Sequence, residues 1–260
     1  MATVAALGNR VDIKKLDDSF RKVNVWAGWG GIIFTAGFLL ACIPGVSYQI
    51  PPTLNAMNTP QEVHDFYVAH TLGIQIGAWL GMCFSAFYYV WGAAVAAMLR
   101  RVENGRPPVL TYIQLGAIGV GVFNSVLYFF WMAWCAFRCA DIPPEMLRSM
   151  NDMLFIQLEF EVFPLSLWAV AIGLEILLDK SPNPVFPRWC GWLNFWYAGL
   201  VMTGQFMIFF HAGPFAWNGV FALYWPAFVF FAWISAMSWM MLKPIKTDSG
   251  VQHVSQELYT

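Results

Sequence analysis

The chain has 260 residues, of which 59% are hydrophobic, 18% aromatic and only 11% charged, and its net charge is −1. A soluble domain carries about 25% charged residues, so this composition excludes a soluble globular protein. The sequence has no glycine-rich phosphate loop and no long basic run, so we expect no nucleic-acid partner, and its five scattered cysteines do not form a secreted disulfide framework.

Six apolar runs are long enough to cross a bilayer, which takes about 20 apolar residues. In chain order they are Val23–Cys42, Thr71–Met98, Leu110–Phe137, Met153–Leu178, Trp189–Phe210 and Val220–Leu242. We therefore predict an all-α polytopic bundle of six transmembrane helices over 23–242. An amphipathic or flexible cytoplasmic segment, 1–22, would precede it, and a flexible cytoplasmic tail, 243–260, would follow it.

Lysine and arginine are distributed unevenly between the two ends of this predicted bundle. Twelve of the fourteen fall in the tails and loops that six crossings place on one side, and only Arg138 and Arg148 fall on the other. By the positive-inside rule, both termini are cytoplasmic. The chain would then be a multi-pass protein of the plasma membrane, which is the inner membrane if the cell is bacterial.

Two of the outer connections carry signals for the start of a helix. Thr59-Pro60-Gln61-Glu62 is a capping box with proline at the first helical position, so a helix is expected to run from there into the second span. The segment 141–145 has a similar pattern before the fourth span. We therefore expect an outer rim of short helices rather than irregular loops.

Glu159 and Glu161 lie inside the fourth apolar run, in its predicted outer half. An ionised side chain at the bilayer centre costs at least about 2.5–3.5 kcal/mol, so such residues usually have a partner, a cavity or a function. Residues two apart in a regular helix point roughly 200° from each other, so we expect at most one of the two to face a given cavity. These two glutamates are the candidate catalytic residues.

Glu161 is the stronger candidate because it shares a helical stripe with other polar and aromatic residues of the fourth run, namely Gln157, Trp168 and Glu175. The alternative is a structural carboxyl that is hydrogen-bonded to Asn124, Gln205 or tryptophan indoles. Glu175 itself is expected to reach the cytoplasmic interface and to pair with Lys180 or Arg188.

A polar stripe on the third run, Asn124, Tyr128, Trp131, Cys135 and Cys139, is predicted to complete an aromatic-walled cavity. Together with outer residues of other spans, the candidate ligand-binding set is Gln157, Trp168, Asn124, Tyr128, Trp131, Gln205, His70, His211 and Trp217. Cys135 and Cys139 are interpreted as packing residues, and we predict no metal site and no cofactor.

Small residues and prolines indicate where helices approach closely or break. Gly73, Gly77 and Gly81 form a ridge on the second span for close backbone contact. Pro164 and Pro226 fall inside the fourth and sixth spans, where each either lines a site or only kinks its helix.

The first functional hypothesis is a protein that binds or transports a hydrophobic small molecule, such as a lipid, sterol, terpenoid or hydrocarbon, in a cavity open to the outer leaflet. The second is an integral-membrane acid/base enzyme of isomerase, cyclase or hydratase type that uses a desolvated glutamic acid. The third is an accessory subunit of a membrane complex, or a homo-oligomer. The fourth is a haem-binding redox protein with His70 and His211 as axial ligands.

Overall fold

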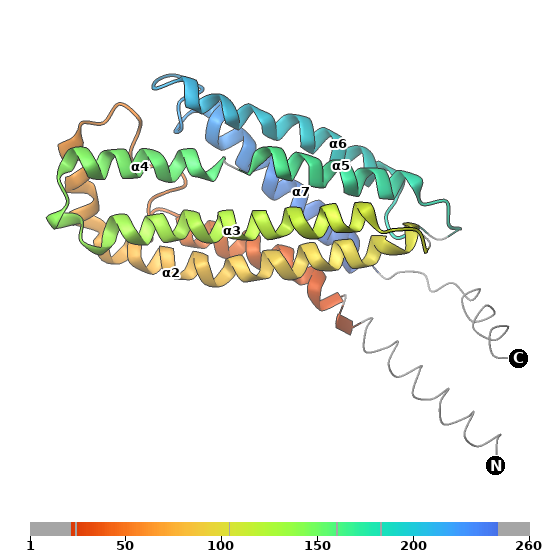
Figure 1. Ribbon diagram of the computed structural model, residues 1–260. Helices are drawn as coiled ribbons and strands as arrows, with labels where there is room; N and C mark the ends of the chain where they lie inside the picture. The colour runs from red at the N-terminus through yellow and green to blue at the C-terminus, as the bar shows by residue number, and fades with distance from the viewer. Residues whose placement is uncertain (1–21, 24, 104, 160, 183, 244–260) are drawn as a thin grey trace, which may run out of the picture.

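The computed structural model describes residues 22–23, 25–103, 105–159, 161–182 and 184–243, which form an all-α bundle (Figure 1). Its elements in chain order are the first span, Val25–Cys42, then α2 Pro60–Leu99, η1 Arg100–Glu103, α3 Val109–Phe137, η2 Cys139–Asp141, α4 Pro144–Leu158, α5 Val162–Leu178, α6 Arg188–Leu200, the 3-10 helix η3 Val201–Phe209, the π-helix η4 Val220–Tyr224 and α7 Trp225–Leu242. The segments predicted to be amphipathic or flexible lie outside the described residues, apart from their innermost positions.

Five stretches of the described chain are long and apolar enough to span a membrane. They are Val25–Cys42, Pro60–Glu103, Val109–Phe137, Pro144–Leu178 and Val220–Leu242. The sixth crossing consists of α6 followed by η3, whose 13 and 9 residues extend about 37 Å in total at their respective rises. The predicted polytopic bundle is therefore confirmed.

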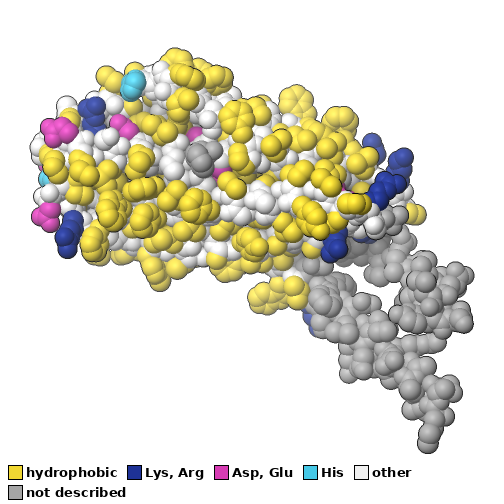
Figure 2. All heavy atoms as spheres, viewed as in Figure 1, with side chains coloured by type: hydrophobic (Ala, Val, Ile, Leu, Met, Phe, Trp, Pro, Cys, Tyr) yellow, Lys and Arg dark blue, Asp and Glu magenta, His cyan; other side chains and the backbone are white. Residues whose placement is uncertain are grey.

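The first and last helices of the described chain, the first span and α7, lie side by side. A Cβ atom at Gly28 would lie 3.3 Å from the side chain of Leu242. At the same end, Nη2 of Arg101 lies 3.3 Å from Oδ2 of Asp179, which ties the α2–α3 connection to the α5–α6 connection. The described α2–α3 and α5–α6 connections carry Arg100, Arg101, Arg106, Lys180 and Arg188, and we call the end where these connections meet the basic end. Figure 2 shows hydrophobic side chains covering the visible face between two charged ends.

At the opposite end, α2 begins with the predicted capping box. The backbone N–H of Thr59 donates to Oε2 of Glu62 at 2.7 Å, and the N–H of Glu62 donates to Oγ1 of Thr59 at 3.3 Å. Helix α4 begins at Pro144, also as predicted. These helices continue into the spans, α2 with a local kink at His70, so the expected rim of short helices forms the first turns of α2 and α4 rather than separate elements.

Aromatic rings fill the core on the basic side of the bundle. Trp91, Trp168 and Trp233 are buried and pack nearly perpendicular to one another, with ring centroids 5.2–5.6 Å apart. Tyr197 stacks on Trp233 with centroids 4.3 Å apart. Each such aromatic pair contributes about 0.5–1.5 kcal/mol beyond the burial of its area.

The predicted glycine ridge of α2 does make close contacts. A Cβ atom at Gly73 would collide with the carbonyl of Val46, and one at Gly81 would collide with the ring of Phe129. The ridge therefore lets α2 approach both the connection that follows the first span and the neighbouring helix α3.

Candidate functional site

The fourth apolar run is interrupted at the two glutamates. Helix α4 ends at Leu158 and α5 begins at Val162, with Glu159 and Glu161 as the flanking C-cap and N-cap residues. Pro164 in the first turn of α5 explains the position of the break, because proline has no N–H to donate to the carbonyl four residues earlier and is tolerated only near a helix start.

Side-chain amides satisfy the backbone groups that the break leaves free. Nδ2 of Asn124 donates to the carbonyl of Leu158 at 3.0 Å, and the Gln205 amide donates to the carbonyl of Glu159. The Gln157 amide donates in turn to the carbonyl and the side-chain oxygen of Asn124. These three predicted ligand-binding residues are thus engaged in holding the interrupted helix, as non-helical backbone at membrane depth requires.

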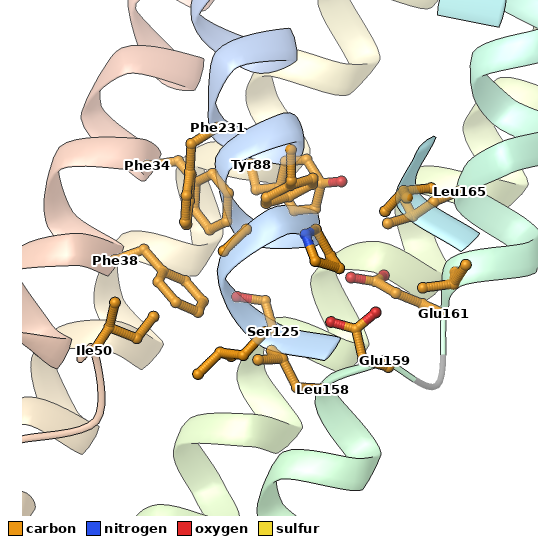
Figure 3. A pocket seen from close by; sticks show the side chains of 16 residues that line it. Phe34, Phe38, Ile50, Tyr88, Ser125, Leu158, Glu159, Glu161, Leu165 and Phe231 are labelled. Carbon is orange, nitrogen blue, oxygen red and sulfur yellow. The ribbon is translucent and has the colours of Figure 1, made fainter. Parts of the chain in front are cut away.

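Both glutamates line one cavity of about 60 Å³, which we call the carboxyl cavity (Figure 3). Each residue is only 7% exposed. The prediction that at most one of them would face a given cavity was wrong, because it assumed a regular helix through both positions. The interruption removes the angular constraint and turns both carboxyl groups to the same side.

Aromatic rings form most of the opposite wall of the carboxyl cavity. They belong to Phe34, Phe38, Tyr88, Phe230 and Phe231, and Figure 3 shows the labelled rings facing the two carboxyl groups. Among the described residues of the lining, Ser125 is the only polar one besides Tyr88 and the two glutamates, and its hydroxyl lies 2.7 Å from that of Ser85. No Lys, Arg or His of the described chain lines the cavity.

Three residues that line the carboxyl cavity also carry a buried polar atom without a partner among the described residues. Oε2 of Glu159, Oε2 of Glu161 and the hydroxyl of Tyr88 are all buried and make no hydrogen bond to the described residues. Burying such atoms without a hydrogen bond costs free energy, so a ligand, an ion or water that supplies the missing hydrogen bonds would bind there favourably.

Two glycines let the glutamates approach neighbouring helices. A Cβ atom at Gly204 of η3 would overlap the carboxyl group of Glu159. A Cβ atom at Gly121 of α3 would lie 3.1 Å from Oε2 of Glu161 and 3.3 Å from the hydroxyl of Tyr88. The second pair of distances shows that the Glu161 carboxyl and the Tyr88 hydroxyl converge on the same point of α3.

Two grooves adjoin the carboxyl cavity, one apolar and one lined partly by polar side chains. The α7 groove, about 420 Å³ in volume, lies between the first span and α7 and shares Ile50, Leu223, Ala227 and Phe231 with the cavity. The η3 groove, about 310 Å³, shares Glu159 with the cavity and is also lined by Gln157 and Gln205. The carboxyl of Glu159 thus stands between the cavity and the second groove.

Three helix interruptions surround this site. Besides the break before α5, the α-helix α6 gives way to nine residues of 3-10 helix, and the π-helix η4 precedes α7 at Pro226. A 3-10 run longer than three or four residues is uncommon and often marks a hinge. Pro226 lines the cavity, which favours a role in the site for this proline, whereas Pro164 is not among the lining residues and lies in the first turn of α5.

The other aromatic residues of the predicted set do not line the carboxyl cavity. Trp168 belongs to the three-tryptophan core, and Tyr128 is buried against the ring of Phe38, with centroids 5.8 Å apart. Trp131 is partly buried and packs on Phe130.

Trp217 lies in the hairpin between η3 and η4, where it makes contacts with α4. Its indole N–H donates to Oδ1 of Asp152 at 2.9 Å, and its ring stacks on Phe155 with centroids 4.1 Å apart.

His70 lies at a local distortion of α2, where Nδ1 is 2.9 Å from the carbonyl of Phe66. His211 is exposed in the hairpin. Within the described residues, no group of three or more His, Cys, Asp or Glu side chains could hold a metal ion.

Glu175 corrects a second prediction. It does not reach the interface to pair with Lys180 or Arg188 but is fully buried, where the Gln114 amide donates to its carboxyl group. Glu103, which accepts hydrogen bonds from the N–H groups of Leu110 and Thr111, lies close to it. Glu175 stays buried because Gln114 of the neighbouring helix α3 offers it a hydrogen-bond donor at the same depth, a contact between helices that the local sequence does not reveal.

The sequence reasoning missed the aromatic wall of the cavity, including Tyr88 and the phenylalanines of the first span and α7. Pro226 was the one available signal, since it marked the turn of the sixth span that borders the site. A comparison of the chain with protein-family models, with curated proteins and with solved structures finds no match.

Proposed function

We propose that this multi-pass membrane protein binds a hydrophobic small molecule at the carboxyl cavity and transports or delivers it within the membrane. The observation that carries the proposal is that two buried carboxyl groups line one aromatic-walled cavity, which shares four lining residues with an apolar groove. The enclosed part has room for only a few water-sized groups, at about 10–15 Å³ each, so it suits the polar end of a ligand rather than a whole lipid.

The α7 groove suits the apolar remainder of such a ligand. Its volume of about 420 Å³ falls within the usual range for small-molecule pockets, and its lining is almost entirely apolar. Because the groove opens on the side of the bundle, a molecule dissolved in the bilayer could enter from the lipid without crossing water. The interrupted helices support a transport role, since discontinuous helices commonly form the binding sites of transporters.

Native mass spectrometry of the protein purified in mild detergent tests this function. We expect the wild type to retain one class of hydrophobic molecule selectively, and Glu161→Gln or Glu159→Gln to retain about tenfold less, because each loses a charge-capable acceptor in a buried site. Glu175→Gln is the matched control, since it changes a buried carboxyl outside the cavity lining. Retention of the same unselective lipids by all four proteins would overturn the proposal.

A second candidate function is the acid/base enzyme, which the presence of two neighbouring carboxyl groups in one cavity favours. One group, held neutral by its apolar surroundings, would donate a proton while the other accepts one. Turnover of a bound hydrophobic molecule that both Glu→Gln variants abolish, while still binding it, would select this function over transport. Product that forms equally in both variants would reject it.

An oligomer or a larger membrane complex is a separate proposal about partners. Light scattering of the purified protein, with the mass of bound detergent subtracted, would test it. A homogeneous monomer that retains the ligand would show that the binding function needs no second chain.

A further inference from the structure

We propose that the polar end of the ligand is a protonated primary amine, bound between Glu159, Glu161 and Tyr88, with its hydrocarbon part in the α7 groove. This inference rests on the proposed function, because it names the chemical class that the same site would accept. It is argued from the charge balance of the cavity, from its free hydrogen-bond acceptors and from its shape.

The charge balance of the carboxyl cavity favours a cation. The cavity holds two carboxyl groups, and among the described residues no Lys, Arg or His lines it. Two ionised carboxylates in one buried site repel each other, and a single one is expensive without a counter-charge. One ammonium group beside one carboxylate and one neutral carboxylic acid gives a site without net charge.

The hydrogen-bond acceptors of the site match an ammonium group in number. Oε2 of Glu159, Oε2 of Glu161 and the hydroxyl oxygen of Tyr88 are buried and unpartnered. A primary ammonium group has three N–H donors and no acceptor, whereas an alcohol has one donor. The Tyr88 hydroxyl and Oε2 of Glu161 both lie within 3.3 Å of the same point beside Gly121, so one donor group can serve both oxygens.

The walls of the cavity also fit this head group. Aromatic rings from the first span, α2 and α7 face the carboxyl groups, and their electron-rich faces attract a cation that has lost its water. The cavity of about 60 Å³ admits an ammonium and its neighbouring methylene groups. A trimethylammonium head is bulkier and has no N–H to donate, so it satisfies neither condition.

Binding of radiolabelled dodecylamine to the full-length protein in phosphatidylcholine nanodiscs tests the inference, with empty nanodiscs as the blank. We expect saturable binding at neutral pH and displacement by unlabelled dodecylamine. Dodecanol, dodecyltrimethylammonium and dodecanoate should each displace the label at least about tenfold less well, because they lack the charge or the three donors. Equal displacement by dodecanol, or stronger displacement by dodecanoate, would overturn the amine assignment.

Variants separate a specific site from general partitioning. Glu159→Gln and Glu161→Gln should each weaken dodecylamine binding about tenfold, whereas Glu175→Gln should leave it within about twofold. Tyr88→Phe keeps the ring and removes the hydroxyl, so it should weaken dodecylamine binding but not dodecanol binding. A purely structural role of Tyr88 would change both equally and would contradict its assignment as an acceptor.

The same experiment distinguishes failure of this inference from failure of the proposed function. Saturable binding of dodecanol that depends on Glu161, without any preference for the amine, rejects the amine and keeps the hydrophobic-ligand function. If none of the four probes saturates the folded wild type, the inference is rejected, and the mass-spectrometric comparison above decides the function independently.

Discussion

The carboxyl group of Glu159 lies against Gly204 so closely that a Cβ atom at position 204 would overlap it. Glu159 belongs to the break before α5 and Gly204 to the 3-10 helix η3, so two interrupted helices meet at this contact. The position of the carboxyl group in the cavity therefore depends on the absence of a side chain on the neighbouring helix.

Gly204→Ala should consequently displace the Glu159 carboxyl group. We expect the free energy of unfolding to fall by about 1–3 kcal/mol through overpacking, and ligand retention to fall with it. Thermal unfolding of the purified protein in detergent measures the first effect. Gly199→Ala is the control, because no atom would lie within 4 Å of its Cβ. Equal changes in both variants would show that loss of glycine itself, rather than the contact, is responsible.

The amides of Asn124 and Gln205 hold the break by donating to the carbonyls of Leu158 and Glu159. Asn124→Ala and Gln205→Ala leave these carbonyls without donors in an apolar region, which should destabilise the fold by about 1–3 kcal/mol each. Denaturant titration monitored by tryptophan fluorescence checks this. The control Gln61→Ala removes an exposed amide and should leave stability nearly unchanged. A loss of stability comparable to that of the two buried-amide variants would argue against a specific role of Asn124 and Gln205 at the break.

The spans and their ends could be predicted from the sequence because they follow from local chemistry. A run of about 20 apolar residues must cross the bilayer, and Thr59 with Glu62 closes a capping box within four residues. Five of the six predicted spans are long and apolar enough to cross a membrane, and the capping box is present. Neither prediction needs any knowledge of which helices are neighbours.

The geometry of the site could not be predicted in the same way. Placing Glu159 and Glu161 on opposite faces followed correctly from a regular helix, and Pro164 was the only local sign that the helix is interrupted. The direction of each carboxyl group is set by residues far away in the chain, such as Gly121 and Gly204. Glu175 shows the same limitation, because its partner Gln114 is 61 positions away.

The hairpin between η3 and η4 is fastened to α4 by Trp217, whose indole N–H donates to Asp152 while its ring stacks on Phe155. Trp217→Phe keeps an aromatic ring but removes the donor, so we expect a loss of about 1–3 kcal/mol in unfolding free energy. Limited proteolysis should also cut the hairpin, residues 211–219, more readily. Trp192→Phe, on an exposed ring of α6, serves as the control, and equal sensitivity of the two variants would rule out the fastening role.

Asp179 links stability to pH at the basic end of the bundle. Burial by itself would raise the pKa of its carboxyl group, but hydrogen bonds from Ser181 and from the Arg101 guanidinium outweigh burial and hold the pKa below its ordinary value of 3.8. Because the pKa is lower in the folded than in the unfolded chain, the ionised group stabilises the fold above that value. This contribution is lost as the pH falls below 3.8 and through the lower folded-state pKa.

Asp179→Asn should therefore be less stable than the wild type at neutral pH, on the order of 1 kcal/mol, since Arg101 is partly exposed and solvent screens the pair. The difference should shrink towards zero as the pH is lowered through the acidic range. Unfolding temperatures of both proteins across a pH series measure it, with Asp141→Asn at the opposite, exposed end as the control. A difference that stays constant with pH would mean that packing of the side chain, rather than its charge, stabilises this connection.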